Sequence, residues 1–224
     1  MSDQAFCLFA SRSRTRVLAG RVRHDPAQAL RVAAELPGGP WRRSGATTFA
    51  EALMSRTGDV YVGAFGDTVV VAKEDVWDGL EDGPVGPTPW VDAVLRALPG
   101  SRVLSAVVAR ESWGYAWFEA GRRVRARSGI CGERLLLDVG EPVPEDAVWV
   151  QRRIVVDGER SCVWEDANRR LRVEDEIDAG YEAAVEQSRE FLGCGLLYDE
   201  LAERIPVEAF QAVRASGPRT GGAS

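Results

Sequence analysis

His24 is the only histidine in the chain, and this limits the chemistry that its side chains can do. A Ser/His/Asp or Cys/His mechanism would have to use it, because such mechanisms need an imidazole to carry a proton. His24 stands directly before Asp25-Pro26, which is typical of a helix start, and no G-x-S-x-G motif accompanies it. The sequence also lacks an H-E-x-x-H zinc motif and a glycine-rich phosphate loop. We therefore predict no catalytic residues, no metal site and no cofactor, although an enzyme is not excluded.

Three arginines at alternate positions, Arg123, Arg125 and Arg127, form the most distinctive feature. Alternate residues of a strand lie on one face, about 7 Å apart, so this row could bind a phosphate, an acidic protein or a nucleic-acid strand. Lys73 is the only lysine, which makes arginine the general cation of this chain. A solvated sheet face, or an internal cover of ion pairs, is the alternative interpretation.

Three glutamates, Glu182, Glu186 and Glu190, recur every fourth residue on a helix predicted over residues 178–192. They lie one above the next and repel one another, so they need solvent or a cationic neighbour. We hypothesise that this helix docks over the arginine row, or that both rows stay exposed and bind separate partners. These glutamates and the three arginines are the predicted ligand-binding or partner-binding residues.

The remaining reactive groups give weaker signals. Acidic residues cluster at 141–146 and at 174–178, without the spacing of an EF-hand, and a solvated loop and a helix start account for them. The four cysteines are far apart, which predicts reduced thiols in a cytoplasmic protein: Cys7, Cys131, Cys162 and Cys194. Cys131, between two glycines, is the one thiol that a turn could expose.

The arginine row is positioned by a predicted hairpin, residues 112–128, with a two-residue turn at Ala120-Gly121. A regular two-residue turn places Trp117 opposite Val124 and puts Trp113, Tyr115 and Trp117 on the core face. The same register places the three arginines on the opposite, solvent-facing side. A different loop length would change this pairing.

Similar patterns predict the other elements. Further strands are expected at 5–10, 17–22, 59–65, 68–73, 102–109, 134–139, 154–156 and 161–164, with hairpins joining 59–65 to 68–73 and 154–156 to 161–164. Helices are expected at 26–36, 48–54, 89–98, 178–192, 196–204 and 206–214, and Thr48 with Glu51 predicts a capping box at the start of the second. We predict an α+β fold, a single domain with a hairpin-built antiparallel sheet and helices packed on one face. Its parts would be a sheet core over 1–150, a mainly helical C-terminal part over 151–215, and a flexible tail over 216–224.

The sequence of the hairpin and of the segment after it also resembles that of a known domain family. Its run Ser112 to Trp117, followed by Gly121, Val124-Arg125 and Gly140-Glu141-Pro142, resembles a bacterial domain family of unknown function. The resemblance extends from residues 61–65 to residues 191–193, and residues 152–177 do not match it. It implies the hairpin fold and no activity.

Composition limits the partners. The 224 residues carry a formal net charge of −6, which disfavours nucleic acid and anionic membranes as partners. We find no signal peptide, and no run approaches the roughly 20 apolar residues of a membrane span. The expected function is a soluble, non-catalytic binding module of the immunity or regulator kind, with a possible protein partner and an unknown oligomeric state. The alternative is an enzyme that uses carboxylates and arginines, such as a metal-dependent hydrolase.

Overall fold

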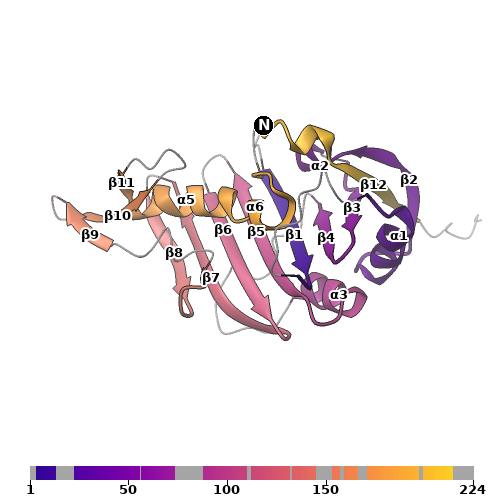
Figure 1. Cartoon of the computed structure of the whole chain (residues 1–224), viewed down its shortest axis with the longest axis horizontal. Coiled ribbons are helices and arrows are strands. Elements are labelled where there is room, and N and C mark those ends of the chain that lie inside the picture. Colours follow the sequence, from indigo (N-terminus) through magenta and orange to yellow (C-terminus); the bar gives the residue numbers. More distant parts are fainter. Residues whose placement is uncertain are drawn as a thin grey trace, which may run out of the picture.

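We describe a computed structural model of the chain. It describes residues 4–13, 23–55, 57–73, 88–109, 112–131, 133–144, 153–156, 159–165, 171–196 and 199–213. Within these residues, nine strands form one antiparallel sheet in the order β2-β12-β3-β4-β1-β5-β6-β7-β8, and three more form a second sheet, β11-β10-β9 (Figure 1).

The strands of the large sheet are β1 Gln4–Ser11, β2 Trp41–Thr48, β3 Val60–Phe65, β4 Thr68–Ala72, β5 Arg102–Ala109, β6 Ser112–Glu119, β7 Arg122–Ile130, β8 Arg134–Val139 and β12 Pro206–Ala212. The small sheet consists of β9 Arg153–Val156, β10 Glu159–Glu165 and β11 Leu171–Asp175. The helices are α1 Pro26–Glu35, α2 Phe49–Met54, α3 Pro89–Ala97, α5 Glu176–Glu186, α6 Arg189–Leu192 and the 3-10 turn η1 Ala202–Arg204.

The predicted helix starts are confirmed by their caps. The Asp25 side chain accepts from the backbone N–H groups of Ala27 and Gln28 at 2.9 and 3.0 Å, and Pro26 is the first residue of α1. Thr48 and Glu51 form the predicted capping box at the start of α2. These contacts satisfy N–H groups that a helix cannot bond internally.

The predicted hairpins β3–β4, β6–β7 and β9–β10 are also confirmed. In the β6–β7 turn, Ala120 and Gly121 have φ values of +48° and +74°. Positive φ at both turn residues matches the right-handed twist of the flanking strands. The two-residue loop is therefore present even though alanine is a poor residue for its first position.

The register predicted for β6–β7 is wrong beyond the turn. A bulge at Val124 shifts the pairing, so Trp117 lies opposite Arg125 and Tyr115 lies opposite Arg127. A bulge adds one residue to one strand and reverses the faces of all residues after it. It separates Arg123, which pairs with Phe118, from the other two arginines, which lie on the core face instead of the solvent face.

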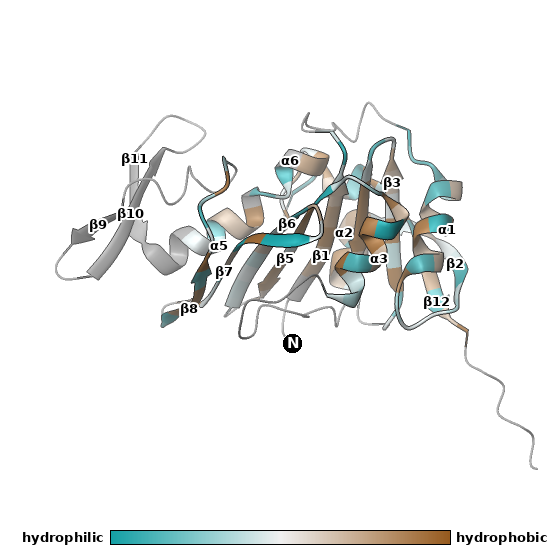
Figure 2. Ribbon diagram, turned by 90° about the horizontal axis from the view of Figure 1, so that it is seen from below, coloured by the Kyte–Doolittle hydropathy of each residue, from teal (hydrophilic) through white to brown (hydrophobic). Residues whose placement is uncertain are grey.

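Helices cover both faces of the large sheet, not one face as predicted. Buried side chains of α1 and α3 pack with one core cluster, which includes Phe6, Leu8 and Phe118. Buried side chains of α2, α5 and α6 pack with the other cluster, which includes Phe9, Trp113 and Trp117. Figure 2 shows the apolar ribbon of β1 and β3 between these layers, with α1 and α3 alternating between polar and apolar positions.

The C-terminal part departs from its prediction. Residues 206–212 form strand β12 rather than a helix, and β12 lies between β2 and β3. β12 is hydrogen bonded to a strand on each side. This pairing stabilises an extended conformation although polar and apolar residues do not strictly alternate in the segment. The predicted division at residue 150 stays a prediction, although the last described strand belongs to the sheet core.

The helix predicted over 178–192 is interrupted after Glu186, where the Ser188 hydroxyl donates to the carbonyl of Val185 at 2.8 Å.

Candidate functional site

Two of the three predicted arginines lie in the protein interior. The side chain of Arg125 is 2 % exposed and that of Arg127 is fully buried. Arg125 Nη1 lies 2.6 Å from Asp138 Oδ1 on β8 and donates to the carbonyls of Val139 and Gly140 at 3.2 and 2.9 Å. Arg127 Nε lies 3.6 Å from the same carboxylate oxygen. Asp138 thus lies within ion-pair distance of both guanidinium groups, and its single negative charge offsets one of their two positive charges.

Helix α5 lies across β6, β7 and β8, and β7 is the strand that carries this arginine pair (Figure 1). Its Gly180 lies against the ring of Trp113, where an added Cβ would come within 2.0 Å of a ring carbon. The guanidinium of Arg127 lies 5.7 Å from the centre of the same ring, and the Trp117 indole donates to Gln187 at 2.6 Å. The arginine pair is therefore part of the core beneath α5.

This arrangement bears on the two hypotheses for the charged rows, the first of which places the helix over the arginines. The helix docks over Arg125 and Arg127, so neither is on an open face, and their burial argues against binding a partner at the surface. Arg123 is half-buried on the opposite side of the sheet, and Glu182 is half-buried on α5. The side chains of Glu186 and Glu190 lie outside the described residues, and the binding role of the row stays a prediction.

The enzyme alternative required a pocket in which Glu141 or Glu145 meets one of these arginines. Glu141 is exposed, and at this end of β8 Arg125 donates to the backbone carbonyl of the preceding residue, Gly140. Glu145 lies outside the described residues. In the part of the chain that the structure describes, no group of three or more His, Cys, Asp or Glu side chains could hold a metal ion.

His24 is half-buried beside Phe65, with the two ring centres 5.4 Å apart. Its pKa is lowered, mainly because burial disfavours the charged imidazolium, while the nearby Glu208 carboxylate acts in the opposite direction. Within the part of the chain that the structure describes, its Nε2 has no hydrogen-bond partner. Among the described residues no serine or cysteine is hydrogen bonded to it, so the geometry of a nucleophile and its base is not formed there.

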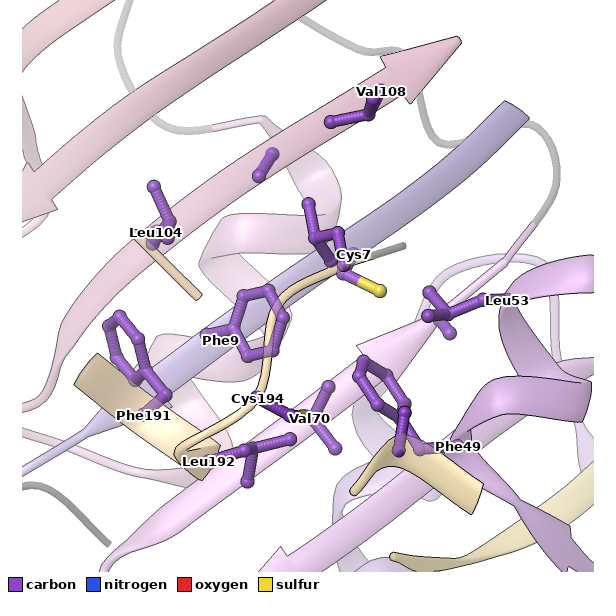
Figure 3. Close-up of a cluster of buried hydrophobic side chains, with 14 of the residues drawn as sticks. Cys7, Phe9, Phe49, Leu53, Val70, Leu104, Val108, Phe191, Leu192 and Cys194 are labelled. Atoms are coloured by element: carbon purple, nitrogen blue, oxygen red, sulfur yellow. The ribbon is translucent and has the colours of Figure 1, made fainter. Parts of the chain in front are cut away.

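Three of the cysteines can be placed, and all three are free thiols. Cys7 and Cys194 are buried in the core cluster of Figure 3, next to Phe9 and Phe191. Burial raises the pKa of both thiols, that of Cys194 to about 12. They are unreactive in the folded protein because the thiolate is the nucleophile. Cys131 is only half-buried.

Sequence reasoning missed a polar pocket of about 700 Å³ at one end of the sheet. Its walls come from three segments: Arg42 on β2, residues 57–59 before β3, and residues 211–213 at the end of β12. A volume of this size is typical of small-molecule sites. The pocket depends on the position of β12, and no local pattern predicted that position.

The pocket contains two opposite charges that are not paired with each other. Among the described residues, neither Arg42 nor the Asp59 carboxylate forms an ion pair or a side-chain hydrogen bond. Gln211, which pairs with Arg42 in the β2–β12 ladder, lines the pocket as well. Guanidinium, carboxylate and amide groups are therefore all available to a ligand from outside.

The model of a protein family described as "Family of unknown function (DUF6928)" matches residues 5–157 of the chain. The chain belongs to this family. The match confirms the resemblance to a domain family of unknown function and assigns no activity to DUF6928. No curated protein and no solved structure was found to match the chain.

The DUF6928 segment supplies only part of the pocket. Arg42 and residues 57–59 lie inside the matched range, whereas residues 211–213 lie outside it. Arg125, Arg127 and Asp138 all lie inside the matched range. In the described part of the chain, no helix is long and apolar enough to cross a membrane.

Proposed function

We propose that this DUF6928 protein is a non-catalytic binding module and that it holds a small polar ligand in the pocket between β2, β12 and β3. The observation that carries the proposal is the pair of charges on its walls, Arg42 and Asp59, which have no ion-pair partner in the described residues. A single exposed charge is stabilised by water and needs no partner. Two opposite charges in one pocket favour a ligand that supplies both counter-charges.

The position of the arginine pair supports this choice of site. Arg125 and Arg127 lie beside Asp138 and are buried, so the strongest cationic feature of the sequence is part of the core. The pocket, in contrast, is open and lined by the exposed side chains of Arg42 and Gln211. The protein partner and the cytoplasmic location expected from the sequence stay predictions.

A matched pair of variants tests the proposed function. Gln211→Trp places a large ring in the pocket at an exposed position, whereas Ser44→Trp places the same ring at an exposed position of β2 that does not line it. A library of polar small molecules is screened against each protein by ligand-observed NMR. We expect compounds that bind the wild type and Ser44→Trp but not Gln211→Trp.

Two outcomes would contradict the proposal. If every compound that binds the wild type also binds Gln211→Trp, the pocket is not the ligand site. If a compound bound there is converted to product, the protein is an enzyme and the non-catalytic function is wrong. Thermal melts of both variants check that the fold is retained.

A further inference from the structure

We infer that the ligand of the pocket is a zwitterion of the amino-acid or short-peptide class, with its carboxylate on Arg42 and its ammonium group on Asp59. This inference rests on the proposed function and names the ligand class. It follows from the charges, the strand register and the open backbone at the end of β12.

The strand register places the two charges on opposite sides of Gln211. Arg42 pairs with Gln211 across the β2–β12 ladder, and the β12–β3 ladder ends at the pair Phe210–Val60. Asp59 precedes Val60 and Gln211 follows Phe210, so Asp59 flanks Gln211 on the side away from Arg42. Neighbouring strands are about 4.8 Å apart, which puts the backbones of Arg42 and Asp59 about 10 Å apart. Among the described residues the two side chains form no ion pair across this gap, so a bridging ligand can contact both.

A ligand with only one charge would fit this site poorly. An anion attracted by Arg42 would be repelled by Asp59, and a cation attracted by Asp59 would be repelled by Arg42. A zwitterion supplies both counter-charges at once. A carboxylate also matches the planar fork of a guanidinium, and an ammonium group supplies three donors to a carboxylate.

The backbone of β12 adds a peptide-like surface. The N–H of Val213 donates to the carbonyl of Pro40 at 2.8 Å, toward the β2 side. Backbone groups alternate in direction along an antiparallel strand, so the N–H and C=O of Ala212 point toward the β3 side. The β12–β3 ladder has ended there, because its last pair is Phe210–Val60. An extended ligand can therefore continue the ladder with its own amide groups.

The opposite wall of the pocket is held in place by hydroxyl groups. The Tyr61 hydroxyl lies 2.6 Å from that of Ser55 and 3.2 Å from that of Thr57. The backbone N–H of Asp59 donates to the Thr57 hydroxyl at 3.4 Å. Gly58 has a φ of +72°, and no atom of the described residues lies within 4 Å of a Cβ added to it, so this wall borders open space. Such a wall is pre-organised, which reduces the entropy lost on binding.

Isothermal titration calorimetry on the full chain tests the inference with glycine, diglycine and triglycine. Each residue adds about 3.5 Å between the terminal charges, so the series measures which separation the pocket accepts. The matched controls are N-acetylated and C-amidated forms of each peptide, which lack one charge. We expect at least one unblocked member to bind, and each blocked form to bind at least about tenfold more weakly, since a charged hydrogen bond contributes this much or more.

Four variants assign the charges to their partners. Arg42→Gln should weaken the unblocked ligand at least about tenfold and abolish the penalty for C-amidation, and Asp59→Asn should do the same for N-acetylation. The controls, Arg31→Gln and Asp67→Asn, remove exposed charges outside the pocket and should leave affinity unchanged. Circular dichroism melts show whether each variant is folded.

The outcomes separate this inference from the proposed function. If singly charged compounds bind in a manner that Gln211→Trp abolishes, and no zwitterion of the series does, the pocket binds ligands but their class is not the one inferred. If blocked and unblocked peptides bind equally, the inference is wrong as well. If no compound of either screen depends on Gln211, both the inference and the proposed function fail.

Discussion

The substitution Asp138→Asn removes a carboxylate that lies beside the two buried arginines while keeping the volume of the side chain. Asp138 Oδ1 lies 2.6 Å from Arg125 Nη1 and 3.6 Å from Arg127 Nε, and the arginine side chains are 2 % and 0 % exposed. Removing one partner of a buried ion pair costs about 3–5 kcal/mol, because the remaining charge has lost its compensation. The Asp138 side chain is 21 % exposed and retains some contact with water, so we expect a loss of about 3 kcal/mol.

This loss is measured by chemical denaturation, with Glu141→Gln as the control. Glu141 is exposed, and its substitution should change the free energy of unfolding by no more than about 0.5 kcal/mol. For a chain of this size, the expected loss in Asp138→Asn lowers Tm by about 6–12 °C. A loss in Asp138→Asn as small as that in the control would refute the assignment of Asp138 as the counter-charge.

A double substitution tests the pair itself. Arg125→Met removes one cation and fills its space with an apolar chain, and Asp138→Asn then leaves less charge uncompensated. We expect the double variant to be at least about 1 kcal/mol more stable than the sum of the single losses predicts, since groups in contact couple by this order. Strict additivity would mean that Arg125 and Asp138 do not interact.

Three further predictions use the same structure. Gly180→Ala should lower the free energy of unfolding by about 1–3 kcal/mol because its methyl group meets the Trp113 ring, whereas Gly45→Ala, with open space around it, should lack this penalty in the same melts. The lowered pKa of His24 means that the unfolded chain binds its proton more readily, so stability should fall as pH drops through the ordinary histidine pKa of about 6.5. This part of the pH dependence should disappear in His24→Gln, measured as unfolding free energies at several pH values. In native protein, Cys131 should react with a thiol reagent before the two buried thiols of Figure 3, as peptide mass spectrometry of labelled protein can show.

Local signals in the sequence were sufficient for many elements. The caps at Asp25 and Thr48 and the turn at Ala120-Gly121 each involve residues within four positions of one another, and the structure has them where they were predicted. Their contacts depend on side chains that are neighbours in the chain, so a short window of sequence contains the whole interaction. The aromatic face of β6 was predicted for the same reason.

Non-local pairing decided the rest. The bulge at Val124 adjusts β7 to its partner, and one extra residue was enough to move Arg125 and Arg127 from the surface to the core. Strand β2 was not predicted because its exposed polar residues lack an apolar face. The segment 206–212 became a strand because β2 and β3 lie on either side of it. The pocket joins all three of these segments, so it could not be predicted without the sheet order.

The position of β12 has a consequence for how the chain folds. Pro206 pairs with Thr48, so β2 can join the sheet only after almost the whole chain has been synthesised. Contacts between residues so far apart in sequence make folding slow, because a large loop must close first. The DUF6928 match ends at residue 157, yet the strand that completes its sheet comes later. A chain cut at residue 157 would present β3 as an open sheet edge, with β2 lacking its neighbour, and such edges promote aggregation. The folding unit of this protein is therefore longer than the segment by which its family is defined.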